Sequence, residues 1–222
     1  MKKLGTGILA ASALLLAGTA SAATSGLPQW TYGQVGYFQA DSTGKDQTDA
    51  YTVEGSLQFL DVMHFQASYI NGSLGAGPVT NDFDGYQLTL GYHPAITESS
   101  QAVFNVIYYD SNYKVDEGSD PERDGYGLGI GFRSNVTDHV EASAIAYWTN
   151  SNIKNGNFDF CSGSNCDSTN VSLQFGGRWN FTKAISAGAT VILGDDVIGS
   201  GADSMNVDVR WTFDGVDIGS RW

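Results

Sequence analysis

Apolar residues occupy every second position through most of this chain. In the clearest segment, 51–59, Tyr51, Val53 and Leu57 alternate with Thr52 and Glu54, and the pattern continues to 59. Alternation with a period of two predicts a β-strand with one apolar and one polar face. The same pattern predicts ten strands, at about 29–40, 50–60, 63–71, 85–93, 101–111, 125–133, 139–149, 169–180, 184–193 and 204–213.

The two faces of these strands differ in chemistry. One face carries no charge across its middle, and aromatic residues bracket it, as Tyr86 and Tyr92 do. Tyr and Trp favour the interface between lipid and water. The opposite face is polar or small, as in Gly125, Gly127 and Gly129. A narrow barrel needs small inward residues where side chains converge, so we expect an all-β, up-and-down antiparallel transmembrane barrel. For the first and fifth strands, the sequence leaves undecided which residues face outward. A soluble β-protein is the alternative to a membrane barrel.

Connection lengths alternate along the chain. The links 61–62, 94–100, 134–138 and 181–183 are short, whereas 41–49, 72–84, 112–124, 150–168 and 194–203 are long. Outer-membrane barrels have short periplasmic turns and longer outer loops. We therefore expect both chain ends in the periplasm and an even strand number. Ten strands satisfy this, and eight remain possible if two pairs merge.

The first residues have the pattern of a secretion signal. Lys2 and Lys3 precede an apolar stretch from Ile8 to Ala17, and Ala20-Ser21-Ala22 resembles a cleavage site. We expect 1–22 to be removed and 23–222 to form one domain. The formal net charge of the whole chain is −13, which argues against nucleic acid as a partner.

The last predicted strand places Val207, Val209, Trp211 and Phe213 on one face. With this signal the chain resembles the small outer-membrane β-barrels of Gram-negative bacteria, over its whole mature length. The resemblance implies an outer-membrane location, contact with lipid and lipopolysaccharide, and assembly by periplasmic chaperones and the barrel-assembly machinery. Such chains usually end at the aromatic residue. Here either Phe213 closes the barrel above a periplasmic tail, 214–222, or Trp222 is the true end.

Six charged residues fall on the inward face, three acidic and three basic: Glu54, Arg133, Glu141, Arg178, Asp208 and Arg210. Arg133 and Glu141 flank one short turn and could pair, and Asp208 lies two positions from Arg210. Because an unpaired buried charge is costly, this balance favours ion pairs that fill the lumen. The expected function is a structural or surface-interaction barrel with a side-chain-plugged lumen. The alternative is a small, porin-like diffusion channel whose pairs act as a gate.

Catalysis and cofactors are not expected. Barrel enzymes such as the omptin-like proteases rely on a histidine near the outer rim, whereas His64, His93 and His139 fall at the periplasmic ends of strands. Asp195-Asp196 has no histidine nearby. The acidic outer loops lack calcium-loop spacing, so no metal site is predicted. Cys161 and Cys166, the only cysteines, predict one disulfide in a secreted chain.

Overall fold

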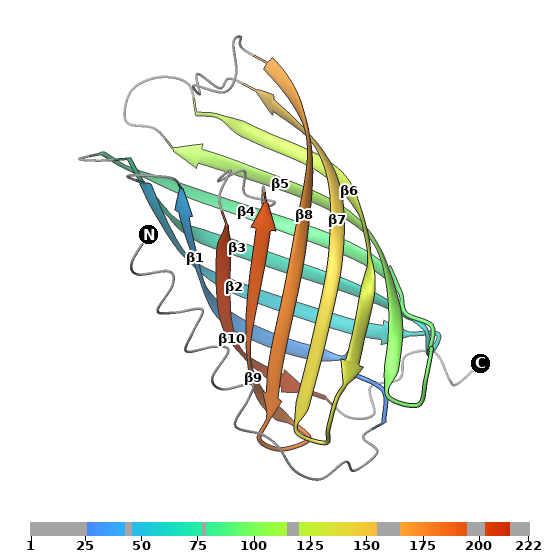
Figure 1. The fold of residues 1–222 in the computed structure, drawn as a ribbon. Helices are drawn as coiled ribbons and strands as arrows, with labels where there is room; N and C mark the ends of the chain where they lie inside the picture. The colour runs from blue at the N-terminus through green and yellow to red at the C-terminus, as the bar shows by residue number, and fades with distance from the viewer. Residues whose placement is uncertain are drawn as a thin grey trace.

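The computed structural model describes residues 26–42, 46–76, 79–114, 120–154, 165–194 and 203–213. Within these ranges the chain forms one closed antiparallel barrel in which each strand pairs with its sequence neighbours (Figure 1). The ten strands are β1 (Tyr32–Ser42), β2 (Asp46–Phe59), β3 (Met63–Ala76), β4 (Val79–Tyr92), β5 (Ser100–Lys114), β6 (Glu122–Asn135), β7 (Val140–Lys154), β8 (Asn165–Asn180), β9 (Ile185–Gly194) and β10 (Ser204–Thr212). The expectation of ten strands is confirmed, and that of eight is wrong.

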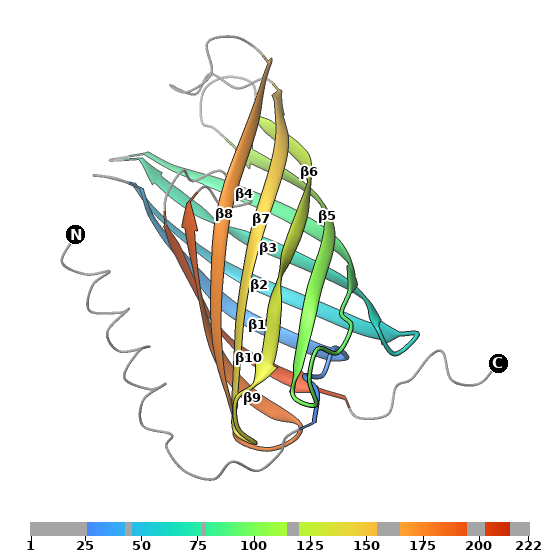
Figure 2. The same cartoon turned by 45° about the vertical axis from the view of Figure 1, so that its right-hand side comes forward.

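The barrel closes between β1 and β10, which lie side by side in both views (Figures 1 and 2). Tyr32 lies opposite Thr212, and just beyond this pair the amide of Phe213 donates to the carbonyl of Thr31. The closing strand is therefore the one that carries the Val207–Phe213 pattern. Residues 1–25, with the expected signal, and 214–222, with the expected tail, lie outside the described residues.

The outer face of the barrel is apolar all round. Its exposed residues include the rows predicted for lipid contact, such as Leu88 and Leu90 on β4 or Leu128 and Ile130 on β6. The structure also establishes which residues of the first and fifth strands face outward. Val35 and Tyr37 of β1, and Phe104, Val106 and Tyr108 of β5, face outward. No helix in the described ranges is long and apolar enough to cross a membrane.

The two ends of the barrel differ in their connections. At one end, here called the turn end, short turns join β2 to β3, β4 to β5, β6 to β7 and β8 to β9. At the other, the loop end, the strands run further than predicted. For example, β2 begins at Asp46 and β8 at Asn165, because the hydrogen-bonded ladder continues beyond the last apolar residue of the outward row. Side chains still alternate there, with inward residues such as Phe83 buried and outward residues such as Asp82 and Asp84 polar.

Aromatic and small side chains form an apolar part of the interior at the loop end. Phe38, Ala40, Ala50, Phe83 and Tyr113 form a buried apolar group that we call the loop-end cluster. The rings of Phe83 and Tyr113 stack with centroids 6.0 Å apart.

The inward glycines of β6 make room for two tyrosine rings. A Cβ on Gly125 would lie 2.5 Å from the Tyr109 hydroxyl oxygen, and one on Gly129 would lie 2.6 Å from the Tyr147 ring. These glycines therefore let the rings lie flat against the barrel wall.

Candidate functional site: the barrel lumen

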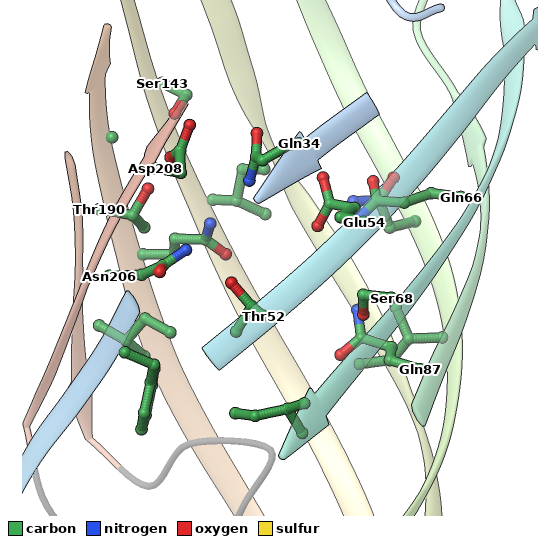
Figure 3. Close-up of a pocket in the computed structure, with 18 of the residues that line it drawn as sticks. Gln34, Thr52, Glu54, Gln66, Ser68, Gln87, Ser143, Thr190, Asn206 and Asp208 are labelled. Carbon is green, nitrogen blue, oxygen red and sulfur yellow. The ribbon is translucent and has the colours of Figure 1, made fainter. Parts of the chain in front are cut away.

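A cavity of about 270 Å³ lies inside the barrel. Polar side chains from opposite walls converge on it (Figure 3). They come from β1–β4 on one side and from β7, β9 and β10 on the other: Gln34, Thr52, Glu54, Gln66, Ser68, Gln87, Ser143, Thr190, Asn206 and Asp208. Amide, hydroxyl and carboxylate groups thus line the middle of the lumen, as alternation places them.

A two-pronged ion pair lies at the turn end of this cavity. The Arg133 guanidinium donates from Nε and Nη2 to the two Glu141 carboxylate oxygens at 2.7 and 2.8 Å. In the β6–β7 ladder, Arg133 lies opposite Ser143, which is the next inward residue after Glu141. The ion pair therefore runs diagonally between the two strands. Both residues are buried, which means that each charge depends on the other for its stabilisation.

A second pair joins strands that are not neighbours. Arg178 of β8 donates from Nη2 to Asp208 of β10 at 2.5 Å. Gly188 of β9 lies between them in register. A Cβ on Gly188 would lie 2.8 Å from the Arg178 Nη2 atom, so the absence of a side chain there opens the path across β9.

Arg210 links the two pairs. Its Nε donates to Gln34 Oε1 at 2.9 Å, and the same oxygen accepts from Arg178 at 3.1 Å. Its Nη1 lies 3.9 Å from Glu141. The guanidinium also lies 3.7 Å above the Tyr32 ring, whose hydroxyl donates to Glu54 at 2.8 Å. All six charged residues predicted for the lumen therefore belong to one group, here called the ionic layer.

Trp30 is the main residue that sequence reasoning missed. The first strand was expected from residue 29, but it begins at Tyr32, and the segment 26–31 instead runs towards the far wall of the turn end. Trp30 is buried, and its indole Nε1 donates to Gln101 Oε1 of β5 at 2.8 Å. The Asn135 side chain at the end of β6 donates to the Gly26 carbonyl at 2.6 Å. Segment 26–31, here called the strap, therefore reaches from β1 to β5 and β6.

Two histidine rings and one cation surround Trp30. Its ring stacks on His64 and His93, with centroids 3.9 and 4.8 Å away, and the Arg133 guanidinium lies 4.5 Å from its centre. Gln101 also lies 3.2 Å from His93 Nδ1. Both histidine side chains are fully buried in this stack. A proline two positions before Trp30, at Pro28, is the one sequence signal that could have indicated a break before β1.

The remaining predicted residues lie elsewhere. His139 is exposed at the turn end, where it stacks on Trp179. Val207, Val209, Trp211 and Phe213 all lie on the outer face of the β10 end. Cys161, Asp195 and Asp196 lie outside the described residues, and only the backbone of Cys166, in β8, is described, so the disulfide stays a prediction.

No protein-family model and no curated protein matches the chain. Similar solved structures include the KdgM porin, with 11% identity over 81% of this chain and 99% of that one at a TM-score of 0.39. The translocator domain of the autotransporter NalP from Neisseria meningitidis has 12% identity, with 96% and 95% covered and a TM-score of 0.45. The outer membrane protease OmpT from Escherichia coli has 10% identity, with 83% and 94% covered, also at 0.45.

At these identities the likeness concerns the fold alone, and a porin, a translocator and a protease do not share one activity. The decisive observations come from the molecule itself. A closed barrel with an apolar exterior and a charged interior is suited to span a membrane with lipid against its outer face. The chain is an outer-membrane β-barrel. Because outer-membrane barrels have short turns in the periplasm and longer loops outside, we assign the turn end to the periplasm.

Proposed function

We propose that this barrel does not conduct and that it serves a structural or surface-interaction role in the outer membrane. The observation that carries the proposal is the strap, which brings Trp30 to side chains of β3, β5 and β6. Beside it, the ionic layer connects β1, β2, β6, β7, β8 and β10. An ion crossing the lumen would have to displace stacked rings and separate buried pairs, and separating such pairs is costly.

Planar-bilayer recording tests this proposal. Purified wild-type protein is expected to give no steady conductance steps, and steady open channels would overturn the proposal. Trp30→Ala removes the ring on which the strap depends, so brief openings are expected. Trp148→Ala is the matched control, because Trp148 lies on the outer face, and it is expected to behave as the wild type.

A small diffusion channel is the second candidate. The cavity favours it, since its lining extends from Trp30 at the periplasmic end to Ser111 towards the loop end. In that case the ionic layer would be a gate. Arg133→Ala and Glu141→Ala would then change the size or frequency of wild-type conductance steps, whereas in a filled barrel there are no wild-type steps to change.

The surface role that we propose is contact with lipid and lipopolysaccharide. Above the lipid-facing Tyr86, Tyr108 and Tyr126, the next outward positions on β4, β5 and β6 are Asp84, Asp110 and Asp124. Asp110 lies directly opposite Asp124. Because lipopolysaccharide is anionic, carboxylates at this height would contact its head groups through shared Ca²⁺ or Mg²⁺ ions. Retention of lipopolysaccharide by the purified protein, compared between wild type and Asp110→Asn/Asp124→Asn, tests this role.

We also propose that the barrel is assembled by periplasmic chaperones and the barrel-assembly machinery, and that it is not an enzyme. Trp211→Ala and Phe213→Ala should delay the heat-modifiable folded form in cells if the last strand is the insertion signal. A hydrolase or acyltransferase activity that is lost on substitution of any loop-end residue would contradict the proposal that the barrel is not an enzyme.

A further inference from the structure

Three of the periplasmic turns share one construction. Each has an apolar residue, then a threonine, then a charged residue: Ile96-Thr97-Glu98, Val136-Thr137-Asp138 and Phe181-Thr182-Lys183. In each turn the threonine hydroxyl oxygen accepts the amide two residues on, at 3.3, 3.2 and 3.1 Å respectively.

The same three turns are also closed by the backbone. The amide of the apolar residue donates to the carbonyl four residues on, at 2.8 Å for Ile96 and Val136 and 3.0 Å for Phe181. Each turn is therefore held by two independent hydrogen bonds, one from the amide of the apolar residue and one to the hydroxyl of the threonine that follows it. The apolar side chain does not fold back onto the protein, because Ile96, Val136 and Phe181 are 62%, 61% and 61% exposed.

The exposed residues continue the lipid-facing rows of their strands. Ile96 lies on the same alternate positions as Leu90 and Tyr92, and Val136 as Ile130 and Phe132. Phe181 follows the row of β8 in the same way. The next charged residue, Glu98, Asp138 or Lys183, is exposed as well. Each turn thus presents an apolar group and a charge within three residues.

Strand length explains why such residues are needed. An antiparallel strand rising about 3.4 Å per residue with a tilt of about 45° gains about 2.4 Å of height per residue. From Tyr126 to Phe132 the apolar row of β6 covers about 14 Å on that scale, whereas the apolar band of a membrane barrel is about 25 Å tall. Extending the row to Val136 brings it to about 24 Å on the same scale. Ten residues also separate Val171 from Phe181, which follows β8 directly, and Tyr86 from Ile96, which lies four residues beyond the end of β4.

We infer that Ile96, Val136 and Phe181 insert into the periplasmic leaflet of the outer membrane and complete the lipid-binding band of the barrel. The lipid is favoured over a protein partner because these residues are continuous with the lipid-facing rows. The charges that follow them mark the level at which water begins. The three turns therefore fix the depth of the barrel in the membrane.

Spin labelling in vesicles tests the inference. Single cysteines are introduced at 96, 136 and 181 in a Cys161→Ser/Cys166→Ser background and labelled, and the full chain is folded into dimyristoyl phosphatidylcholine vesicles. Matched controls carry the label at 98, 138 and 183, two residues on in the same turns. Labels at 96, 136 and 181 are expected to collide with oxygen in preference to a water-soluble nickel complex, and the control labels to show the opposite preference.

Two outcomes would overturn the inference. One is equal access of the nickel complex to both sets, which would place the turns in water. The other is protection at 96, 136 and 181 that disappears when the protein is diluted with lipid, which would assign the turns to contact between copies. Folding of each variant is verified by heat-modifiable migration, so that a misfolded variant is not counted as either outcome.

Discussion

The periplasmic end of the lumen is filled by charged and hydrogen-bonded side chains, whereas the loop end holds rings packed against glycine and alanine beside a buried cation, Arg123, which donates to Ser151. The first holds the pairs Arg133–Glu141 and Arg178–Asp208, and the second holds the loop-end cluster around Phe83. Inward positions of this barrel therefore accommodate either charged or apolar side chains, depending on their surroundings. Charges are accepted where partners from several strands reach them, and apolar groups are accepted where glycines leave space.

The largest loss is expected when one partner of the ionic layer is removed. Arg133→Ala leaves Glu141 buried without its two-pronged partner, and Arg210 Nη1 lies 3.9 Å from its carboxylate. Breaking a buried pair in this way typically costs about 3–5 kcal/mol of the free energy of unfolding. Urea unfolding in lipid vesicles, followed by heat-modifiable migration, measures it. The double variant Arg133→Met/Glu141→Leu should lose much less, and an equal loss would show that packing rather than charge matters here.

At the loop end, a comparable test removes a ring instead of a charge. Phe83→Ala empties a fully buried position in the loop-end cluster, so a loss of about 3 kcal/mol is expected from the cavity it leaves. The control is Phe104→Ala, which faces lipid. If the control loses as much stability as Phe83→Ala, the loop-end cluster is not a core.

Glycine substitution tests whether ring packing explains the inward glycines. Gly125→Ala places a methyl group against Tyr109, and overpacking of this kind costs about 1–3 kcal/mol. Gly55→Ala is the matched control, since nothing lies within 4 Å of the Cβ position on Gly55. It should be neutral or slightly stabilising. Equal effects at both sites would point to a general effect of alanine in strands.

Much of this interior could be predicted from alternation alone. Because side chains alternate strictly along a strand, the inward side of Glu54, Arg133 and Glu141 follows once the outward rows are known. The Arg133–Glu141 pair is also readable, since both residues flank one short turn. These are local relations, and a single sequence contains them.

The contacts between distant strands could not be predicted in the same way. Asp208 was noted beside Arg210, but its ion-pair partner is Arg178, two strands away across Gly188. Trp30 was placed in the first strand, although it pairs with Gln101, 71 residues later. Both contacts depend on the closed barrel bringing its walls together. Alternation specifies which way a side chain points, but not how far across the lumen it reaches.

The smallest effect is expected from the Lys154–Asp124 ion pair, which is as short as the Arg133–Glu141 pair. Lys154 Nζ lies 2.7 Å from Asp124 at the loop end, as Arg133 Nε lies 2.7 Å from Glu141 at the periplasmic end. The Lys154 and Asp124 side chains are 46% and 32% exposed, whereas those of Arg133 and Glu141 are 7% and 11% exposed. Water and salt weaken an exposed pair, and neither charge needs its partner for solvation. Lys154→Ala should therefore leave the urea midpoint unchanged within error at high and low salt. A loss approaching that of Arg133→Ala would mean that distance, rather than burial, sets the strength of ion pairs in this barrel.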